Sequence, residues 1–199
     1  MSSVIIAGNT SGTITLDAPN VAGTTVLTLP TSSGTVTVAG VNSNIVAGTS
    51  VASTSGTSID FTSIPSWVKR ITVMFNGVST NGVTNILLQL GTSGGVQTSG
   101  YTGTSGYVGG TPVSTNPTNG FSLFNDTASD TRSGAITFSQ LNASSNIWVC
   151  CGFVGYTART FNQLTSGSVT LSGTLTQVRI TTVNGTDTFD AGSVNILYE

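Results

Sequence analysis

The sequence predicts an all-β protein: a short-strand segment at the N-terminus, followed by a β-sandwich or jelly-roll domain. Three observations predict this class. Apolar and hydroxyl side chains alternate with a period of two along most of the chain, as in strands that bury one face. No stretch keeps a helical period, and residues that favour helices are scarce. Gly and Pro interrupt the alternating runs at short intervals, as they do in turns.

The first 45 residues form the predicted N-terminal segment. Residues 11–40 read SGTITLDAPNVAGTTVLTLPTSSGTVTVAG, and each short strand in them offers only two or three apolar side chains. At about 25 cal/mol per Å² of buried apolar area, so few side chains cannot offset the roughly 1–2 kcal/mol per residue that backbone ordering costs. We therefore expect a docking or shaft segment that is completed by the following domain or by other copies of the chain. The apolar candidates for this contact are Ile14, Leu16, Val26, Leu27, Leu29, Val36 and Val38.

Residues 46–57 are expected to be a linker, or alternatively a continuation of the shaft, and residues 58–199 a compact sandwich domain. Between residues 91 and 120 a Gly-rich stretch is expected to form a long loop. Short strands with such turns are typical of sandwiches and jelly rolls. The expected strands are Ser58–Phe61, Val68–Val78, Asn85–Gly91, Gly120–Phe124, Ala135–Leu141, Ile147–Gly155, Ser168–Leu171, Leu175–Val183 and Ser193–Tyr198.

Two segments of the predicted sandwich resemble each other. Residues 69–90 and 178–199 both contain Arg-Ile-Thr, then Asn-Gly, then Asn-Ile-Leu. Asn-Gly is a common turn dipeptide in hairpins. The pattern indicates two similar hairpins in one sheet, with an internal duplication as the alternative.

Charge is scarce along the whole chain. Only 6% of the residues are charged, and the net charge is −2. Five basic residues cannot form the cationic surface that nucleic acids or anionic membranes require. No apolar run is long enough to cross a membrane, and the N-terminus lacks the basic region of a signal peptide. A surface with so little charge favours association between copies.

The composition argues against catalysis. The chain contains no His, which excludes Ser-His-Asp and Cys-His machinery and removes the commonest transition-metal ligand. Cys150 and Cys151 are adjacent, so a strand would point them to opposite faces, and both are expected to pack as small apolar residues. No cofactor and no metal site is predicted.

Two close pairs of carboxylates, Asp126/Asp130 and Asp187/Asp190, occur in turn-like contexts. We expect their side chains to bond the backbone there. A calcium site at one of the pairs is the alternative, and a glycosidase pair is disfavoured.

Aromatic and basic residues give further expectations. Trp148, Phe153 and Phe161 are expected in the core, and Arg70 is expected to pair with an Asp of another subunit or domain. Tyr101 and Tyr107 lie in the Gly-rich stretch, where amphipathic rings between small residues suit surface recognition. These two tyrosines are the recognition candidates, with a purely structural role as the alternative.

Both ends of the chain resemble structural proteins of tailed bacteriophages. Residues 11–36 resemble an N-terminal strand motif of phage virion proteins. Residues 61–82 and 172–199 resemble the C-terminal β-domain of proteins that are similar to tail fibres. The resemblance implies a homotrimeric all-β appendage whose distal domain contacts the host surface. It covers segments towards both ends of the chain, but not residues 91–146, and it assigns no receptor-contacting residue.

The expected function is therefore a non-enzymatic virion protein, a short trimeric tail fibre for host attachment. It would assemble in the host cytoplasm and reside in the virion, with other virion proteins and a host glycan or protein as partners. The alternative is a capsid decoration or head-fibre protein that stabilises the phage head. A polysaccharide depolymerase is disfavoured, because the chain is short and has few carboxylates.

Overall fold

The structure is a computed structural model that describes residues 3–7, 13–17, 45–109, 113–128, 130–142, 144–160 and 162–199. The chain divides into two units, Met1–Asn42 and Ser43–Glu199. All regular elements of the described residues are strands, and all of them pair antiparallel. The predicted all-β class is therefore confirmed.

The described part of the first unit is a single hairpin. Strand β1 (Ser3–Ala7) pairs antiparallel with β2 (Thr13–Asp17), and among the described residues no third strand joins this sheet. Ile14 and Leu16, two of the predicted contact residues, lie on β2. The others lie outside the described residues: Val26, Leu27, Leu29, Val36 and Val38.

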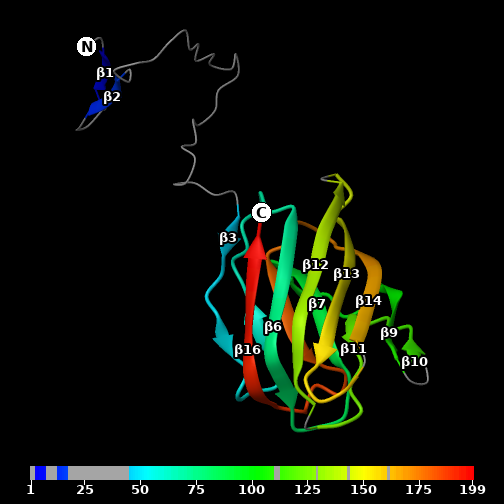
Figure 1. Ribbon diagram of the computed structural model, residues 1–199. Helices are drawn as coiled ribbons and strands as arrows, with labels where there is room; N and C mark the ends of the chain where they lie inside the picture. Colours follow the sequence, from blue (N-terminus) through cyan, green and yellow to red (C-terminus); the bar gives the residue numbers. More distant parts are fainter. Residues whose placement is uncertain are drawn as a thin grey trace. The chain divides into compact units, whose positions relative to one another are not determined.

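The larger sheet of the second unit has the strand order β10-β9-β14-β13-β12-β6-β16-β3, and β4 also pairs with β16 (Figure 1). Strands β6 and β13 of this sheet are rich in β-branched and aromatic residues, which favour strands. The strands of this sheet are β3 (Val46–Ala47), β4 (Val51–Ala52), β6 (Arg70–Thr80), β9 (Thr102–Val108), β10 (Val113–Thr115), β12 (Arg132–Asn142), β13 (Ile147–Tyr156), β14 (Asn162–Thr170) and β16 (Phe189–Tyr198).

The smaller sheet packs against the larger one. Its order is β11-β7-β15-β5, and β8 pairs with the edge of β7. Together the two sheets are consistent with the predicted β-sandwich. The strands of this sheet are β5 (Ile59–Phe61), β7 (Ile86–Thr92), β8 (Gly95–Val96), β11 (Phe121–Leu123) and β15 (Gln177–Thr182).

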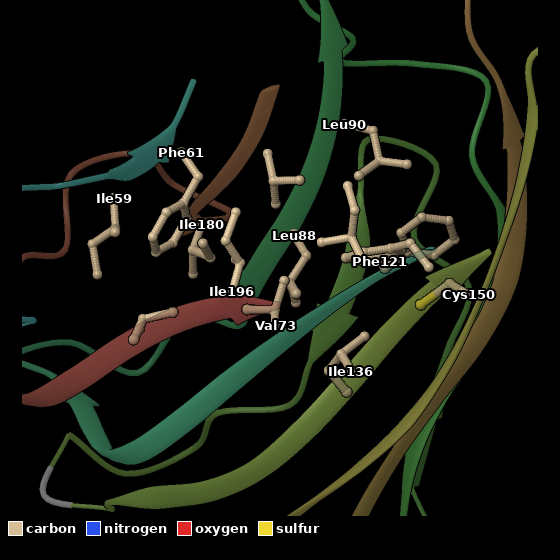
Figure 2. Close-up of a cluster of buried hydrophobic side chains, with 14 of the residues drawn as sticks. Ile59, Phe61, Val73, Leu88, Leu90, Phe121, Ile136, Cys150, Ile180 and Ile196 are labelled. Carbon is tan, nitrogen blue, oxygen red and sulfur yellow. The ribbon is translucent and has the colours of Figure 1, made fainter. Parts of the chain in front are cut away.

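The hydrophobic core lies between the two sheets. Alternate residues of each strand point inward, so Val73 and Ile136 of the larger sheet meet Leu88 and Ile180 of the smaller one (Figure 2). Trp148, predicted as a core residue, is buried there. Burial of this apolar surface is the main stabilising contribution to such a sandwich.

The two similar segments span both sheets. In the first, β6 belongs to the larger sheet and β7 to the smaller; in the second, β15 belongs to the smaller and β16 to the larger. Strand β6 pairs with β16, and β7 pairs with β15. The prediction of two hairpins in one sheet is therefore wrong: each segment crosses from one sheet to the other, and the two segments pair with each other at both strands.

Two segments that were expected to be irregular contain strands. Residues 46–57, expected as a linker, include β3 and β4, which pair with β16 at the edge of the larger sheet. The Gly-rich stretch 91–120 includes β8, β9 and β10. Strand β9 pairs with β14 over seven residues, and its glycines allow this close approach, since a Cβ at Gly103 would lie 2.2 Å from the carbonyl oxygen of Ser166.

Strand β13 places two of the predicted core residues outside. Cys150 is buried and Cys151 exposed, which confirms that they point to opposite faces, but Cys151 is not packed in the core. Phe153 is 67% exposed on the same outer face, so its predicted core position is wrong. Phe161 lies outside the described residues.

The second unit has two distinct ends. At one end β3 begins beside the C-terminal residues, with Val46 opposite Tyr198. At the other end lie the connections β6–β7, β11–β12, β13–β14 and β15–β16 (the lower end in Figure 1). The strand register places them together: Thr80 of β6 is opposite Phe189 of β16, and Arg132 of β12 is opposite Tyr156 of β13. In the smaller sheet, Ile86 of β7 is opposite both Leu123 of β11 and Thr182 of β15. We call the first the terminal end and the second the loop end.

Candidate functional site

The loop end is the candidate site, and its connections are tied together by polar side chains. Arg159, in the β13–β14 connection, forms ion pairs with Asp126 and Asp130 of the β11–β12 connection, with N–O distances of 2.8 and 2.7 Å. The hydrogen bond to Asp126, with the nearby charge of Asp130, raises the pKa of the Arg159 guanidinium above its ordinary value. Asp126 and Asp130 thus both pair with Arg159, and these ion pairs join the β11–β12 connection to the β13–β14 connection.

A second arginine lies beneath this surface. Arg132 is completely buried and donates hydrogen bonds to the carbonyl oxygen of Asp130 (3.0 Å) and to Oδ1 of Asn125 (2.6 Å). Its guanidinium carbon also lies 4.9 Å from the ring centroid of Tyr156. Burial lowers the pKa of Arg132, and these contacts partly offset the cost of burying its charge. Arg132 thereby holds the β11–β12 connection in place from the interior of the sandwich.

The β6–β7 and β15–β16 connections are joined by Asp187. Its Oδ2 accepts hydrogen bonds from the backbone N–H and the hydroxyl of Thr84, and its Oδ1 accepts one from Nδ2 of Asn184. These bonds, led by the one from the Thr84 hydroxyl, lower the pKa of Asp187. A Cβ on Gly82 would lie 2.0 Å from this carboxylate, so any larger residue at that position would push the Asp187 side chain out of these contacts.

Asp187 and Asp190 do not converge on a common centre. Asp190 accepts a hydrogen bond from the hydroxyl of Ser79, and Asp187 bonds different groups. Within the described part of the chain, no group of three or more His, Cys, Asp or Glu side chains is placed to hold a metal ion. The polar side chains of the loop end hold the connections in place. A surface of ordered connections can bind a partner through its shape and its polar groups.

Tyr101 is not on the surface. It is 2% exposed, its hydroxyl accepts a hydrogen bond from the N–H of Leu90 (2.8 Å) and donates one to the carbonyl oxygen of Gln97 (3.0 Å), and its ring packs on Phe121. Burial raises the pKa of Tyr101 to about 12. Its predicted role in surface recognition is wrong, because a buried ring cannot contact a receptor.

Tyr107, the other recognition candidate, lies on β9 near the loop end. It is half-buried, and its ring centroid lies 5.3 Å from that of Phe124, at the start of the β11–β12 connection. Part of the ring surface therefore supports that connection. The remainder is exposed beside the loop end.

Arg70 pairs within its own unit. It forms an ion pair with Glu199, at the terminal end of the neighbouring strand. The expected Asp of another subunit or domain is therefore not its partner in this structure.

A shallow cavity of about 420 Å³ on the outer face of the smaller sheet was not anticipated from the sequence. Its floor includes Leu87 and Gln89, and Arg179 lines it while pairing with Asp60 through N–O distances of 2.6 and 2.9 Å. Asn184, of the β15–β16 connection, lines one side. The one sequence signal for this cavity is Gln89, a polar residue inside the apolar run ILLQL.

Comparisons with known proteins give no relative for this chain: no family model, no curated protein and no solved structure matches it. Among the described residues, no helix is long and apolar enough to span a membrane.

Proposed function

We propose that the chain is a non-enzymatic virion protein of a tailed phage, a short homotrimeric tail fibre that attaches to the host surface. The first unit would dock to the particle or form a shaft with other copies, and the second, a jelly-roll-like sandwich, would present its loop end to the host. The sequence motifs at both ends of the chain support this assignment.

The observation that carries the proposal is the polarity of the second unit. The chain enters it at the terminal end, beside Tyr198, while four connections gather at the opposite end. These connections are held by Arg159, Arg132 and Asp187. This arrangement suits an attachment protein, with the link to the particle at one end and loops on a rigid scaffold, where binding residues often lie, at the other.

The small hairpin of the first unit gives further support. A two-stranded sheet of five-residue strands is marginal in water, because it buries too little apolar surface to offset the cost of backbone ordering. Such a hairpin gains stability when a partner adds strands or covers one of its faces.

The test removes the first unit. Phage particles that lack the protein are mixed with purified full-length chain or with residues 43–199, and particle-bound protein and adsorption to host cells are measured. We expect the full-length chain to bind the particles and restore adsorption, and the shorter chain to stay folded but unbound. Equal binding of the two proteins to particles would refute the docking role of the first unit.

The copy number distinguishes the alternative. Tens of copies or fewer per particle fit a tail fibre, whereas hundreds of copies would instead fit a capsid decoration or head-fibre protein. Quantitative mass spectrometry of purified particles measures this number directly.

A further inference from the structure

The outer face of the larger sheet carries an apolar stripe, which we define as Met74, Ala135, Phe153 and Leu164. The strand register aligns these four residues on the neighbouring strands β6, β12, β13 and β14: Met74 is opposite Ala135, Ala135 opposite Phe153, and Phe153 opposite Leu164. Residues that are directly opposite on one face of a sheet are in side-chain contact. The stripe is therefore one continuous surface.

Phe153 is the exposed residue of the stripe, Met74, Ala135 and Leu164 are half-buried, and the stripe has apolar neighbours. Phe153 is 67% exposed, and Val149 and Cys151, on the same outer face of β13, are exposed as well. Val108, next to the stripe on β9, is 63% exposed. Single exposed apolar residues are common, but a contiguous apolar patch marks an interaction site.

The charged side chains of the second unit lie away from this stripe. Lys69, Arg70 and Glu199 lie at the terminal end, and the ion pair of Arg179 with Asp60 lies on the smaller sheet. At the loop end, the charged side chains lie in the connections or, in the case of Asp190, at the start of β16, and Arg132 is buried. A neutral face offers no attraction to a charged partner, but it meets an identical face without like-charge repulsion.

The size of the face suits a stable contact. Strands β6, β12, β13, β14 and β9 are adjacent and each has at least seven residues. With strands about 4.8 Å apart and about 3.3 Å per residue, they cover roughly 550 Å² in projection. Projecting side chains bring the accessible area towards the roughly 800 Å² that each partner of a standard interface buries.

We propose that other copies of this chain cover the apolar stripe, with the stripes of three copies meeting around a common axis. These copies are supplied by the homotrimer of the proposed function, on which this inference rests. In such a trimer each larger sheet turns its outer face toward the threefold axis, so Phe153 of one copy packs against its counterparts. Cys151 is exposed on β13 two residues before Phe153, so it points to the same face and lies in the contact as well.

The two cysteines provide a native probe of this contact. In a single chain Cys151 is exposed, whereas Cys150 is buried and its thiol pKa is raised by that burial. Ellman's reagent therefore reports one accessible thiol per free chain. At concentrations where the full-length protein forms an assembly of about 60 kDa, which is three chains of 20.1 kDa, we expect the Cys151 thiol to react slowly. On dilution to single chains, one thiol per chain should react at least tenfold faster.

Two variants sharpen the test. Phe153→Asp places a charge in the contact, so we expect one fast thiol per chain and loss of the larger mass. Val83→Asp is the matched control, since Val83 is 58% exposed in the β6–β7 connection, and we expect it to behave as the wild type. Circular dichroism verifies that both variants fold.

Three outcomes would overturn the proposal. A fast thiol in an assembly of about 60 kDa would show that the copies meet elsewhere, while the homotrimer would stand. A fast thiol in a wild-type protein of 20.1 kDa at every concentration would reject the homotrimer as well. Slow reaction that persists in single chains would show that another part of the same chain covers the stripe.

Discussion

Oδ2 of Asp187 accepts two hydrogen bonds from Thr84, one from its backbone N–H (3.2 Å) and one from its hydroxyl (2.6 Å). We expect Asp187→Asn to destabilise the protein by about 1 kcal/mol, because the amide is a weaker acceptor and its NH₂ group conflicts with that of Asn184. Urea denaturation at pH 7 measures this change. An unchanged free energy of unfolding would contradict the structural role of Asp187.

The same contact predicts a pH dependence. The pKa of Asp187 is lower in the folded chain than its ordinary value, so the carboxylate contributes stability above the unfolded pKa of about 3.9. This contribution is lost as the pH falls through the folded pKa. The difference in stability between wild type and Asp187→Asn should therefore be full at pH 6 and shrink below pH 4. A difference that stays constant down to pH 2 would contradict this account.

Removal of the Tyr101 hydroxyl tests the corrected position of this residue. Tyr101→Phe leaves the N–H of Leu90 and the carbonyl oxygen of Gln97 without their side-chain partner in the interior. We expect a loss of about 1–3 kcal/mol in the free energy of unfolding. Host attachment should be unchanged in conditions where the variant is folded. A stable variant that has lost attachment would restore Tyr101 as a recognition residue.

Two arginines allow a matched comparison of buried and exposed charge. Arg132→Ala removes a buried donor from the carbonyl oxygen of Asp130 and from Asn125, and we expect a loss of about 2–4 kcal/mol. Arg179→Ala breaks the exposed pair with Asp60, which we expect to cost about 1 kcal/mol or less. Thermal unfolding of both variants measures the difference. Equal effects would show that Arg132 does not anchor the β11–β12 connection.

Close packing of strands β12 and β13 requires a glycine at position 152. A Cβ there would lie 2.4 Å from the carbonyl oxygen of Ala135 and 2.6 Å from the Cα of Ile136. We expect Gly152→Ala to lower the free energy of unfolding by about 1–3 kcal/mol through strain. Gly94→Ala is the control, because its Cβ would approach nothing closer than 3.5 Å. Similar stability of the two variants would contradict the close strand approach.

Much of the sandwich could be predicted from the sequence, because its strands alternate clearly between apolar and polar residues. Strand β6 reads RITVMFNGVST, with Ile71, Val73 and Phe75 inside, as expected from the alternation. The Gly-rich strand β9, TGTSGYV, escaped prediction because its glycines and hydroxyl residues carry almost no apolar signal. Its pairing with β14 depends on contacts that are distant in sequence, which local patterns cannot encode.

The candidate site was harder to predict than the fold. Strand β13 reads IWVCCGFVGY and is apolar on both faces, so the pattern could not tell that Phe153 points outward and Val154 inward. The partners of Asp126, Asp130 and Asp187 come from connections that are far apart in the sequence. Only the fold brings these connections to one end, so the carboxylate pairs could be noticed in the sequence but not assigned a partner.

The central claim is that other polypeptides complete the first unit. Amide hydrogen exchange over residues 3–17, followed in the full-length chain across a dilution series, tests it most directly. We expect protection of these amides at concentrations where copies associate, and exchange at nearly the unfolded rate once single chains predominate. Strong protection in single chains, independent of concentration, would contradict the claim.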